Sequence, residues 1–207
     1  MKSSIMRGDP LFLRNEFSLD GRYEIPCMKG YGPFDGDISL VSYADTRAND
    51  KVENVHKGVH FFVDDYRFKG IYDHPESSLP KLKQYDFLLT PDYSLYAEMP
   101  LWRQMESVAK NRWVGAYWQS KGLIAIPSIS WSTPKSYQFC FDGVEPGTVV
   151  ALGMIGCKQS KENFLEGYSA MMDKLHPCQI IVFGSPFDEM DGNLLTVDYI
   201  QSRKVVR

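Results

Sequence analysis

Acidic side chains follow two successive apolar runs of the chain, at the points where each run ends. Asp64 and Asp65 come directly after residues 59–63, and Asp92 comes shortly after residues 85–89. A carboxylate at the exit of a buried strand can act as a general base, as a nucleophile or as a group that binds hydroxyls. We therefore predict that Asp92 and Asp65 are the catalytic candidates and that Asp64 takes part in ligand binding.

Other polar and aromatic side chains can complete a ligand site around these carboxylates. Ser94 lies close beyond Asp92, and Trp131 follows the next apolar run. Arg112 and Gln119 have a spacing that places them on one side of a helix. An arginine there can clamp a phosphate or a carboxylate with two hydrogen bonds, and a tryptophan can stack on a base or a sugar. The predicted ligand-binding residues are Asp64, Ser94, Arg112, Gln119 and Trp131.

Each candidate also has a purely structural interpretation. Asp92 can form a turn with the neighbouring backbone or cap the next helix. Asp64 and Asp65 can belong to a solvated turn in which Asp65 pairs with Arg67, and Arg112 can form a structural salt bridge. The residues alone leave these alternatives open.

Cysteine, histidine and glycine patterns give weaker indications. Cys157 lies between an apolar run and a helix start, where the helix dipole favours a thiolate, but no histidine is close to it in sequence. His56 and His60 have the i, i+4 spacing of a helical metal site, yet His60 opens a predicted strand, so we predict no metal site. Residues 156–160 can accept an anion at the helix start, with the help of Lys158. The chain contains neither a P-loop nor a dinucleotide fingerprint, and it indicates no particular cofactor.

Uniformly apolar runs of strand length predict the elements that position these residues. Such runs are typical of strands that are covered on both faces of a sheet. Helical periodicity separates several of them, which is the pattern of βαβ units with parallel strands. We predict strands near residues 38–43, 59–63, 86–89, 123–129, 148–155 and 179–183, with an edge strand in 194–207. We predict helices over residues 161–175, as a right-handed crossover, and over about 100–119.

The longer of these helices contains a glycine, Gly115. A glycine inside a helix costs about 1 kcal/mol relative to alanine. We therefore expect another segment to pack closely against the helix at Gly115.

The first 36 residues are rich in glycine, proline and aromatic side chains, and they follow neither a helical nor a strand period. We predict an irregular N-terminal arm over residues 1–36 and a single α/β domain over residues 37–207. The domain is expected to be a mostly parallel sheet, or a partial, TIM-like barrel, with crossover helices. Asp65, Asp92 and Trp131 should then line one concavity, because neighbouring parallel strands end at the same edge.

The composition excludes several classes of protein. A chain of 207 residues can bury a sizeable core without disulfides or a metal. Lys and Arg total 23 against 26 Asp and Glu, so the net charge is −3 and duplex DNA is not expected as a partner. The four cysteines form no C-x-x-C pair, and no apolar run is long enough to cross a membrane. We therefore expect a reduced protein of the bacterial cytoplasm that does not bind membranes.

Several segments, taken in order, resemble the DUF4417 family, an uncharacterised family of bacteria, phages and integrative mobile elements. The segments are VHFFVDDYRF, LTPDYSLYAEMP, NRWVGAYWQSKGLIAIPSISW, FDGVEPGTVVALGMIGC and FLEGYSAMMDKLHPCQIIVFG. The resemblance spans about residues 16–186, and it implies a phage or mobile-element context without an established activity. The candidate residues within these segments include Asp65, Asp92, Ser94, Arg112, Gln119 and Trp131.

Two functions from different classes fit these observations. The first is a cleft that binds, and can hydrolyse or transfer, a nucleotide- or nucleoside-like small molecule. The residues do not separate catalysis from sequestration, so enzyme activity stays open. The second is a non-enzymatic inhibitor or adaptor that binds a host or phage protein through the aromatic-rich arm at residues 12–34. Chemistry on a flipped or single-stranded base would need a basic groove, which a net charge of −3 does not favour.

Overall fold

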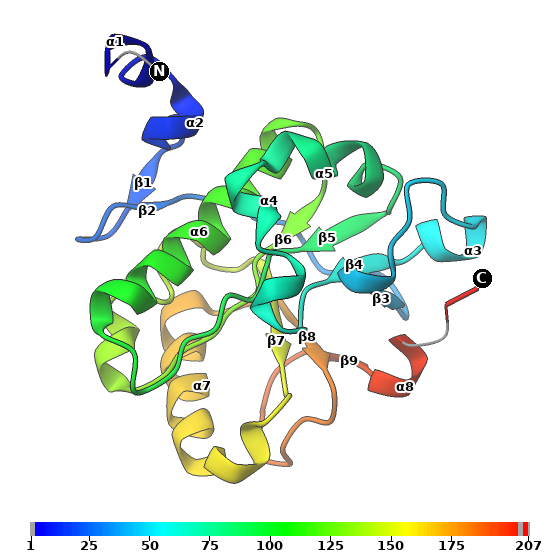
Figure 1. The fold of residues 1–207 in the computed structure, drawn as a ribbon. Coiled ribbons are helices and arrows are strands. Elements are labelled where there is room, and N and C mark those ends of the chain that lie inside the picture. The colour runs from blue at the N-terminus through cyan, green and yellow to red at the C-terminus, as the bar shows by residue number, and fades with distance from the viewer. Residues whose placement is uncertain (1–2, 203–204, 207) are drawn as a thin grey trace.

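Seven parallel strands form the centre of the fold in the computed structural model, which describes residues 3–202 and 205–206 (Figure 1). One sheet pairs β3 (Leu40–Ser42), β4 (Gly58–His60), β5 (Phe87–Leu89) and β6 (Ala125–Ile126) in that order. The other pairs β7 (Val149–Gly153), β8 (Gln179–Phe183) and β9 (Leu194–Val197). A parallel bridge between Ser128 and Ala151 joins the two sheets, so the strand order runs from β3 to β9.

Helices connect the strands and cover their outer faces. α6 (Leu101–Ser120) joins β5 to β6, and α7 (Lys161–Leu175) joins β7 to β8. The chain reaches β4 through α3 (Val52–Val55), and it reaches β5 through α4 (Gly70–Asp73) and α5 (Pro75–Leu82). The remaining helices are α1 (Ser3–Met6), α2 (Pro10–Leu13) and α8 (Tyr199–Ser202), with 3-10 turns at Tyr43–Asp45, Asp65–Arg67, Pro134–Gln138 and Cys157–Ser160. Within the described residues, no helix combines the length and the apolar character that crossing a membrane requires.

The apolar runs of the sequence are strands with both faces covered, as their composition predicts. On β7, Val149 and Ala151 belong to an inner cluster to which all seven strands, or the residues directly after them, contribute. Val150 and Leu152 lie instead among side chains of α7. Successive residues of a strand point to opposite faces, so both faces of β7 need apolar side chains. The predicted α/β architecture, with a mostly parallel sheet and crossover helices, is confirmed.

The strand order has two open ends. Among the described residues, β3 and β9 are the outermost strands, so the hydrogen-bonded order does not close a TIM-like barrel. α8 packs against β3, and Tyr199 of α8 lies on Phe183 of β8 with ring centroids 4.9 Å apart. The edge strand predicted in residues 194–207 covers only Leu194–Val197, and residues 203, 204 and 207 lie outside the described part of the chain.

A proline shortens the strand that was predicted over residues 123–129. Pro127 follows β6 directly, and a proline has no N–H to donate to a neighbouring strand. The residues that follow β6 form hydrogen bonds with the second sheet instead. The N–H of Ala151 donates to the carbonyl of Pro127 at 2.9 Å, and the N–H of Ile129 donates to the carbonyl of Ala151 at 2.8 Å. Pro127 therefore marks the seam between the two sheets.

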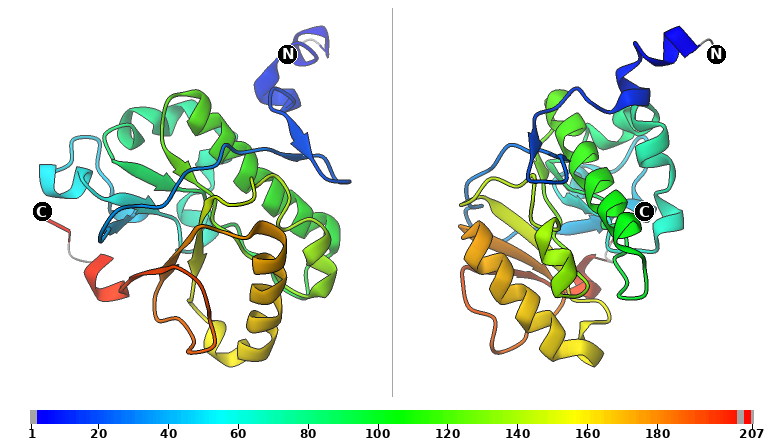
Figure 2. Two further views of the ribbon diagram at one scale, coloured as in Figure 1. Left: turned by 180° about the vertical axis from the view of Figure 1, so that it is seen from behind. Right: turned by 90° about the vertical axis from the view of Figure 1, so that its left-hand side faces the viewer.

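The N-terminal arm runs along the outside of the sheets and helices (Figure 2). Helices α1 and α2 project from the rest of the protein, and a short antiparallel ladder of β1 (Leu19–Asp20) and β2 (Ile25–Pro26) follows them. The guanidinium of Arg14 lies over the ring of Trp113, 3.9 Å from its centroid. Phe34 packs on Phe87 with ring centroids 4.7 Å apart. From Arg14 onward the arm is thus part of the packed structure.

Gly115 of α6 lies against both the arm and the first sheet. A Cβ atom at this position would stand 2.4 Å from Sδ of Met28 and 2.7 Å from Cγ2 of Thr90. Met28 is buried in the arm, and Thr90 is buried at the exit of β5. The close packing expected at this glycine is confirmed, because only a residue without a side chain lets the three segments meet.

Replacing Gly115 by alanine should lower the free energy of unfolding by about 1–3 kcal/mol, because the added methyl group overlaps buried side chains. This cost exceeds the helix-propensity gain of about 1 kcal/mol that alanine offers. Urea unfolding measures the change. Gly70→Ala is the matched control, since a Cβ at Gly70 would meet no atom of the described chain within 4 Å beyond its own neighbours. Equal stabilities of the two variants would contradict the packing argument.

Candidate functional site

A cleft of about 1290 Å³ opens at the carboxyl ends of the parallel strands. Its walls are mainly the segments that leave β3, β4, β5, β6 and β7, and side chains of α7 and α8 complete it. Ligands bind at this edge of parallel α/β sheets, because the loops there vary freely while the sheet holds them in place.

Five of the seven predicted site residues line this cleft. Asp64 and Asp65 follow β4, Asp92 and Ser94 follow β5, and Trp131 follows β6. They come together because β4, β5 and β6 are neighbours in one parallel sheet, so their exits meet at one edge. The chemical roles of these residues remain predictions.

Arg112 lies beneath the cleft rather than on its surface. The side chain is 1% exposed, and the guanidinium donates to the carbonyls of Ser128 at 3.0 Å, Cys140 at 2.9 Å and Asp142 at 3.1 Å. Arg112 also donates to the side-chain oxygen of Asn111. These protein acceptors occupy the guanidinium, so its position does not support the predicted clamp on a ligand phosphate.

Gln119 lies at the end of α6 that leads into β6, away from the cleft. Its amide donates to the carbonyl of Lys29 at 2.9 Å, and its oxygen accepts from the N–H of Lys29 at 2.8 Å. It also donates to the carbonyl of Ala125 at 3.0 Å. Gln119 therefore ties the arm to the sheet, and its position does not support a role in ligand binding.

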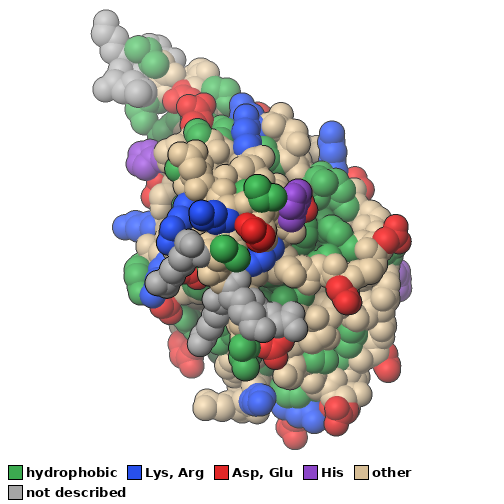
Figure 3. All heavy atoms as spheres, turned by 90° about the vertical axis from the view of Figure 1, so that its right-hand side faces the viewer, with side chains coloured by type: hydrophobic (Ala, Val, Ile, Leu, Met, Phe, Trp, Pro, Cys, Tyr) green, Lys and Arg blue, Asp and Glu red, His purple; other side chains and the backbone are tan. Residues whose placement is uncertain are grey.

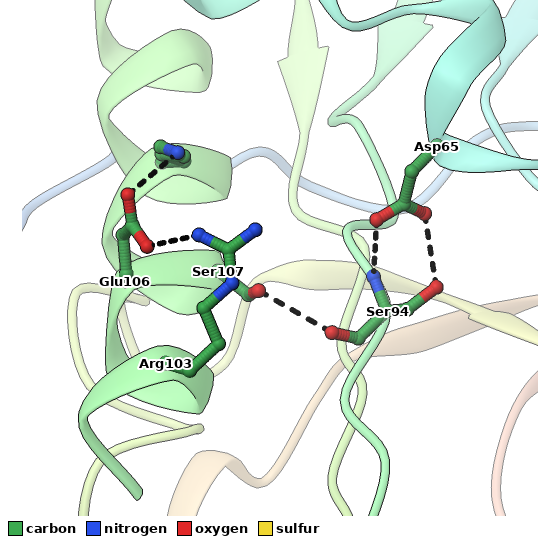
Figure 4. A network of polar contacts seen from close by, with 6 residues as sticks. Asp65, Ser94, Arg103, Glu106 and Ser107 are labelled. Carbon is green, nitrogen blue, oxygen red and sulfur yellow. Dashed lines mark hydrogen bonds and ion pairs between the residues drawn. The ribbon is translucent and has the colours of Figure 1, made fainter. Parts of the chain in front are cut away.

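Asp65 holds the loop that follows β5 (Figure 4). Its two carboxylate oxygens accept hydrogen bonds from the backbone N–H of Ser94 at 3.2 Å and from the hydroxyl of Ser94 at 2.9 Å. The hydroxyl of Ser107 on α6 donates in turn to the carbonyl of Ser94 at 3.3 Å. These hydrogen bonds of Asp65 anchor one wall of the cleft to the exit of β4.

Asp92 is partly buried beside these groups. Removal from water raises the pKa of its carboxyl to about 7, and the negative charge of Asp65 acts in the same direction. A hydrogen bond with Ser130 and the charge of Arg112 oppose the rise in this pKa. Both protonation states are therefore populated at neutral pH, which suits a group that donates or accepts a proton.

Three aromatic rings form the floor of the cleft. The ring centroid of His60 lies 4.2 Å from that of Phe183, and Phe62 lies 5.3 Å from Phe183 in a stacked arrangement. Burial lowers the pKa of His60 to about 3, so its imidazole is neutral at physiological pH. Sequence reasoning treated His60 only as a possible metal ligand. The i, i+2 spacing of Phe62 from His60, the last residue of β4, is the signal that places the two rings on one side of the chain.

Trp131 forms a side wall of the cleft that rests on α7. A Cβ at Gly167 of α7 would stand 2.1 Å from the indole Nε1, and the ring of Phe164 lies 5.0 Å from that of Trp131. The missing side chain at Gly167 makes room for the indole. The indole of Trp131 is therefore held in place against α7, and an aromatic ring held in this way suits stacking against a flat ligand.

The charges around the cleft are mostly negative. Figure 3 shows one face of the molecule, on which both acidic and basic side chains are visible. The cleft itself has five acidic lining residues and one basic residue within the described chain, so it disfavours an anionic ligand. These residues are Asp45, Asp64, Asp65, Asp92 and Glu98, with Arg67 as the cation.

Cys157 also lines the cleft, but as a thiol. Burial raises its pKa to about 11, and the charge of Asp92 adds to the rise. The expected stabilisation of a thiolate at the helix start is thus outweighed by desolvation. Over the described residues, no group of three or more His, Cys, Asp or Glu side chains is arranged to hold a metal ion.

Comparisons with known proteins place the chain in a family. A sequence model described as "Domain of unknown function (DUF4417)" matches residues 17–201. The "Gene 1 protein" of Mycobacterium phage L5 is 38% identical over 189 residues, which covers 88% of this chain and 81% of that protein. The "Gene 1 protein" of Mycobacterium phage D29 is 35% identical over 181 residues, which covers 85% of this chain and 66% of that protein. No solved structure matches the chain. The resemblance carried by the strand-exit segments is thereby confirmed, and the chain belongs to the DUF4417 family, with relatives in phages.

Proposed function

We propose that the cleft binds a nucleoside-like small molecule and that Asp92 exchanges a proton with it. The observation that carries this proposal is the carboxyl of Asp92, whose pKa is raised to about 7 in a cleft with an aromatic floor. Perturbed carboxyl groups of this kind concentrate at functional sites. The same proton exchange would serve hydrolysis, transfer or pH-dependent sequestration of the ligand.

The charge of the cleft favours a nucleoside over a nucleotide. Five acidic side chains, of which Asp92 is only partly ionised at neutral pH, outnumber one guanidinium and repel a phosphate. Arg112, the cation that sequence analysis assigned to a phosphate, donates to backbone carbonyls instead. Carboxylates accept hydrogen bonds from ribose hydroxyls without a phosphate being present.

The aromatic surfaces suit the ring of such a ligand. Trp131 provides a wedged side wall, and Phe62 and Phe183 provide an apolar floor. Stacking of a base on an aromatic side chain contributes about 1–3 kcal/mol per base. Asp65 is already engaged with Ser94, so its contribution is to hold the wall and to raise the pKa of Asp92.

Calorimetric titration with the common nucleosides and their 5′-monophosphates tests the proposed ligand class. We expect at least one nucleoside to bind, and its monophosphate to bind at least about tenfold more weakly because of the negative cleft. Trp131→Ala should weaken nucleoside binding by about 5- to 150-fold through lost stacking. Trp102→Ala is the matched control, since Trp102 is 64% exposed and does not line the cleft. Tighter binding of the monophosphates would refute the assignment to nucleosides.

Asp92→Asn tests the proton-carrying carboxyl without a ligand. The folded protein binds a proton at Asp92 up to about pH 7, whereas the carboxyl has its ordinary pKa of 3.8 when the chain is unfolded. The stabilising contribution of Asp92 relative to the unfolded chain is therefore lost as the pH rises through about 7. The stability of Asp92→Asn relative to the wild type should grow by about 1–3 kcal/mol between pH 5 and pH 8.

Urea unfolding of both proteins at the two pH values measures this difference. Asp64→Asn is the control, because the side chain of Asp64 is 70% exposed and forms only a 3.9 Å ion pair with Arg67. Its stability difference should stay constant within about 0.5 kcal/mol. A pH-independent effect of Asp92→Asn would show that its carboxyl is ionised throughout the range, and the proposal would lose its central residue.

A second candidate function is the binding of a host or phage protein, and exposed apolar side chains at the start of the arm support it. Ile5, Phe12 and Leu13 are exposed on the projecting helices α1 and α2, which precede the family match at residues 17–201. Exposed apolar side chains that cluster on a projecting segment can dock on a partner. The aromatic residues further along the arm, such as Phe17 and Phe34, are instead packed against the protein.

The double variant Phe12→Ser, Leu13→Ser separates the two functions. If the protein affects phage growth through a partner bound by the arm, this variant should lose that effect while its melting temperature and nucleoside binding stay unchanged, because the altered side chains are exposed. Val52→Ser, at a 66% exposed position elsewhere, is the control. A normal effect on phage growth would exclude this segment as the binding element.

A further inference from the structure

The curved sheets leave an opening between β3 and β9, the outermost strands of the described chain. Leu40 of β3 and Val197 of β9 belong to the same inner cluster, although these strands stand at opposite ends of the strand order. The sheets therefore curve around this cluster without closing. α8 follows β9 and packs against β3, so it crosses the opening (Figure 1).

The C-terminal segment, residues 199–202 and 205–206, begins at the carboxyl ends of the strands. The ring of Tyr199 lies on that of Phe183, with centroids 4.9 Å apart. A Cβ atom at Gly184 would stand 2.3 Å from the hydroxyl oxygen of Tyr199. The missing side chain at Gly184 therefore leaves room for the tyrosine at the start of the segment.

The other end of the segment is fastened to α3 by a buried asparagine. The amide of Asn54 donates to the carbonyl of Val206 at 3.0 Å, and its oxygen accepts from the N–H of Val206 at 3.2 Å. Asn54 is 0% exposed, and the neighbouring Val205 packs against the apolar cluster of the first sheet. The segment is thus attached beside β3, because α3 leads into β4, the neighbour of β3.

The C-terminal segment also forms part of the cleft wall. Tyr199 and Ser202 line the cleft, and so does the partly buried Cys157. Burial raises the pKa of Tyr199, and the charge of Cys157 acts in the same direction, so the phenol and the thiol are near one another. Segments that are held by few contacts open locally while the rest of a protein stays folded. Opening of this segment would widen the cleft on the side of β3 and uncover Cys157.

Building on the proposed function, we propose that the C-terminal segment is a movable wall of the cleft, which closes when Val206 binds Asn54. In the closed state the wall presents Tyr199 to the ligand. In the open state the ligand loses this contact. A ligand that contacts the closed wall shifts the population towards it, so binding and closure are linked.

Two variants of Val206 test the wall without a ligand. Val206→Pro removes the N–H that donates to Asn54, whereas the matched control Val206→Ala keeps it. Val206 is 43% exposed, so neither change should disturb the core. We expect Val206→Pro to open about 2- to 10-fold more often than Val206→Ala, the effect of one net hydrogen bond.

Alkylation of Cys157 by N-ethylmaleimide, mapped by mass spectrometry, measures this opening. The rate at Cys157 should rise by the same factor in Val206→Pro. Cys27, a partly buried thiol of the arm, is the internal control. Its alkylation rate should be the same in both variants, because only local opening distinguishes them.

Hydrogen exchange of the α8 backbone amides tests the link to the ligand. A saturating nucleoside should slow this exchange in Val206→Pro by at least about twofold, because the bound ligand favours the closed wall. Exchange in the β1–β2 ladder of the arm should not change, since no residue of this ladder lines the cleft.

The outcomes distinguish this inference from the proposed function. Equal alkylation of Cys157 in Val206→Pro and Val206→Ala would overturn the movable wall, whether or not nucleosides bind. Faster alkylation in Val206→Pro, while no nucleoside binds to the wild type, would support the movable wall and overturn the nucleoside proposal. Nucleosides that bind but leave the exchange of α8 unchanged would overturn the link between wall and ligand and leave the nucleoside cleft standing.

Discussion

The guanidinium of Arg112 is buried where the two sheets meet, and it accounts for much of the order around the cleft. It donates to the carbonyl of Ser128, which follows β6, and to the carbonyls of Cys140 and Asp142, which share a later turn. Ser128 is also the residue through which the first sheet is bridged to the second. A buried cation is costly unless its donors are satisfied, so these carbonyls cannot move apart without losing several kcal/mol. The sheets and α6 are therefore coupled at this point.

Neighbouring hydrogen bonds pass this constraint on to the exit of β5. Ser128 exchanges two hydrogen bonds with Thr90, each 2.8 Å long, and Asn111 of α6 donates to the carbonyl of Pro91 at 2.8 Å. Asp92 follows Pro91 directly, so its backbone is held from two sides before the loop begins. Rigid elements hold functional side chains more accurately than loops do. Asp92 lies on a loop, but the hydrogen bonds of the preceding residues fix the backbone where this loop begins.

The side chains at the rim of the cleft, which include the carboxyl of Asp92, differ in chemistry from the side chains on its floor. The rim is acidic and contains hydroxyl groups, whereas the floor is formed by three rings, of which His60 is neutral. Desolvation acts oppositely on the two titratable groups, because burial always disfavours the charged form: it raises the pKa of Asp92 and lowers that of His60. Both changes reduce the number of charged side chains that the protein keeps inside the cleft near neutral pH.

The sequence by itself determined the elements and the edge at which the site lies. Apolar runs of strand length, helical periodicity in residues 161–175 and the acids after two strands are local patterns, and parallel pairing brings their ends together. The glycine at position 115 likewise indicated close packing before any contact was known. Only the tertiary structure decided the environment of each side chain. Arg112 and Gln119 share a side of a helix with no local sign that one is buried among carbonyls and the other binds the arm. The neutral His60 and the raised pKa of Asp92 also depend on burial by residues distant in sequence, and desolvation is a property of the folded surroundings that no local spacing records.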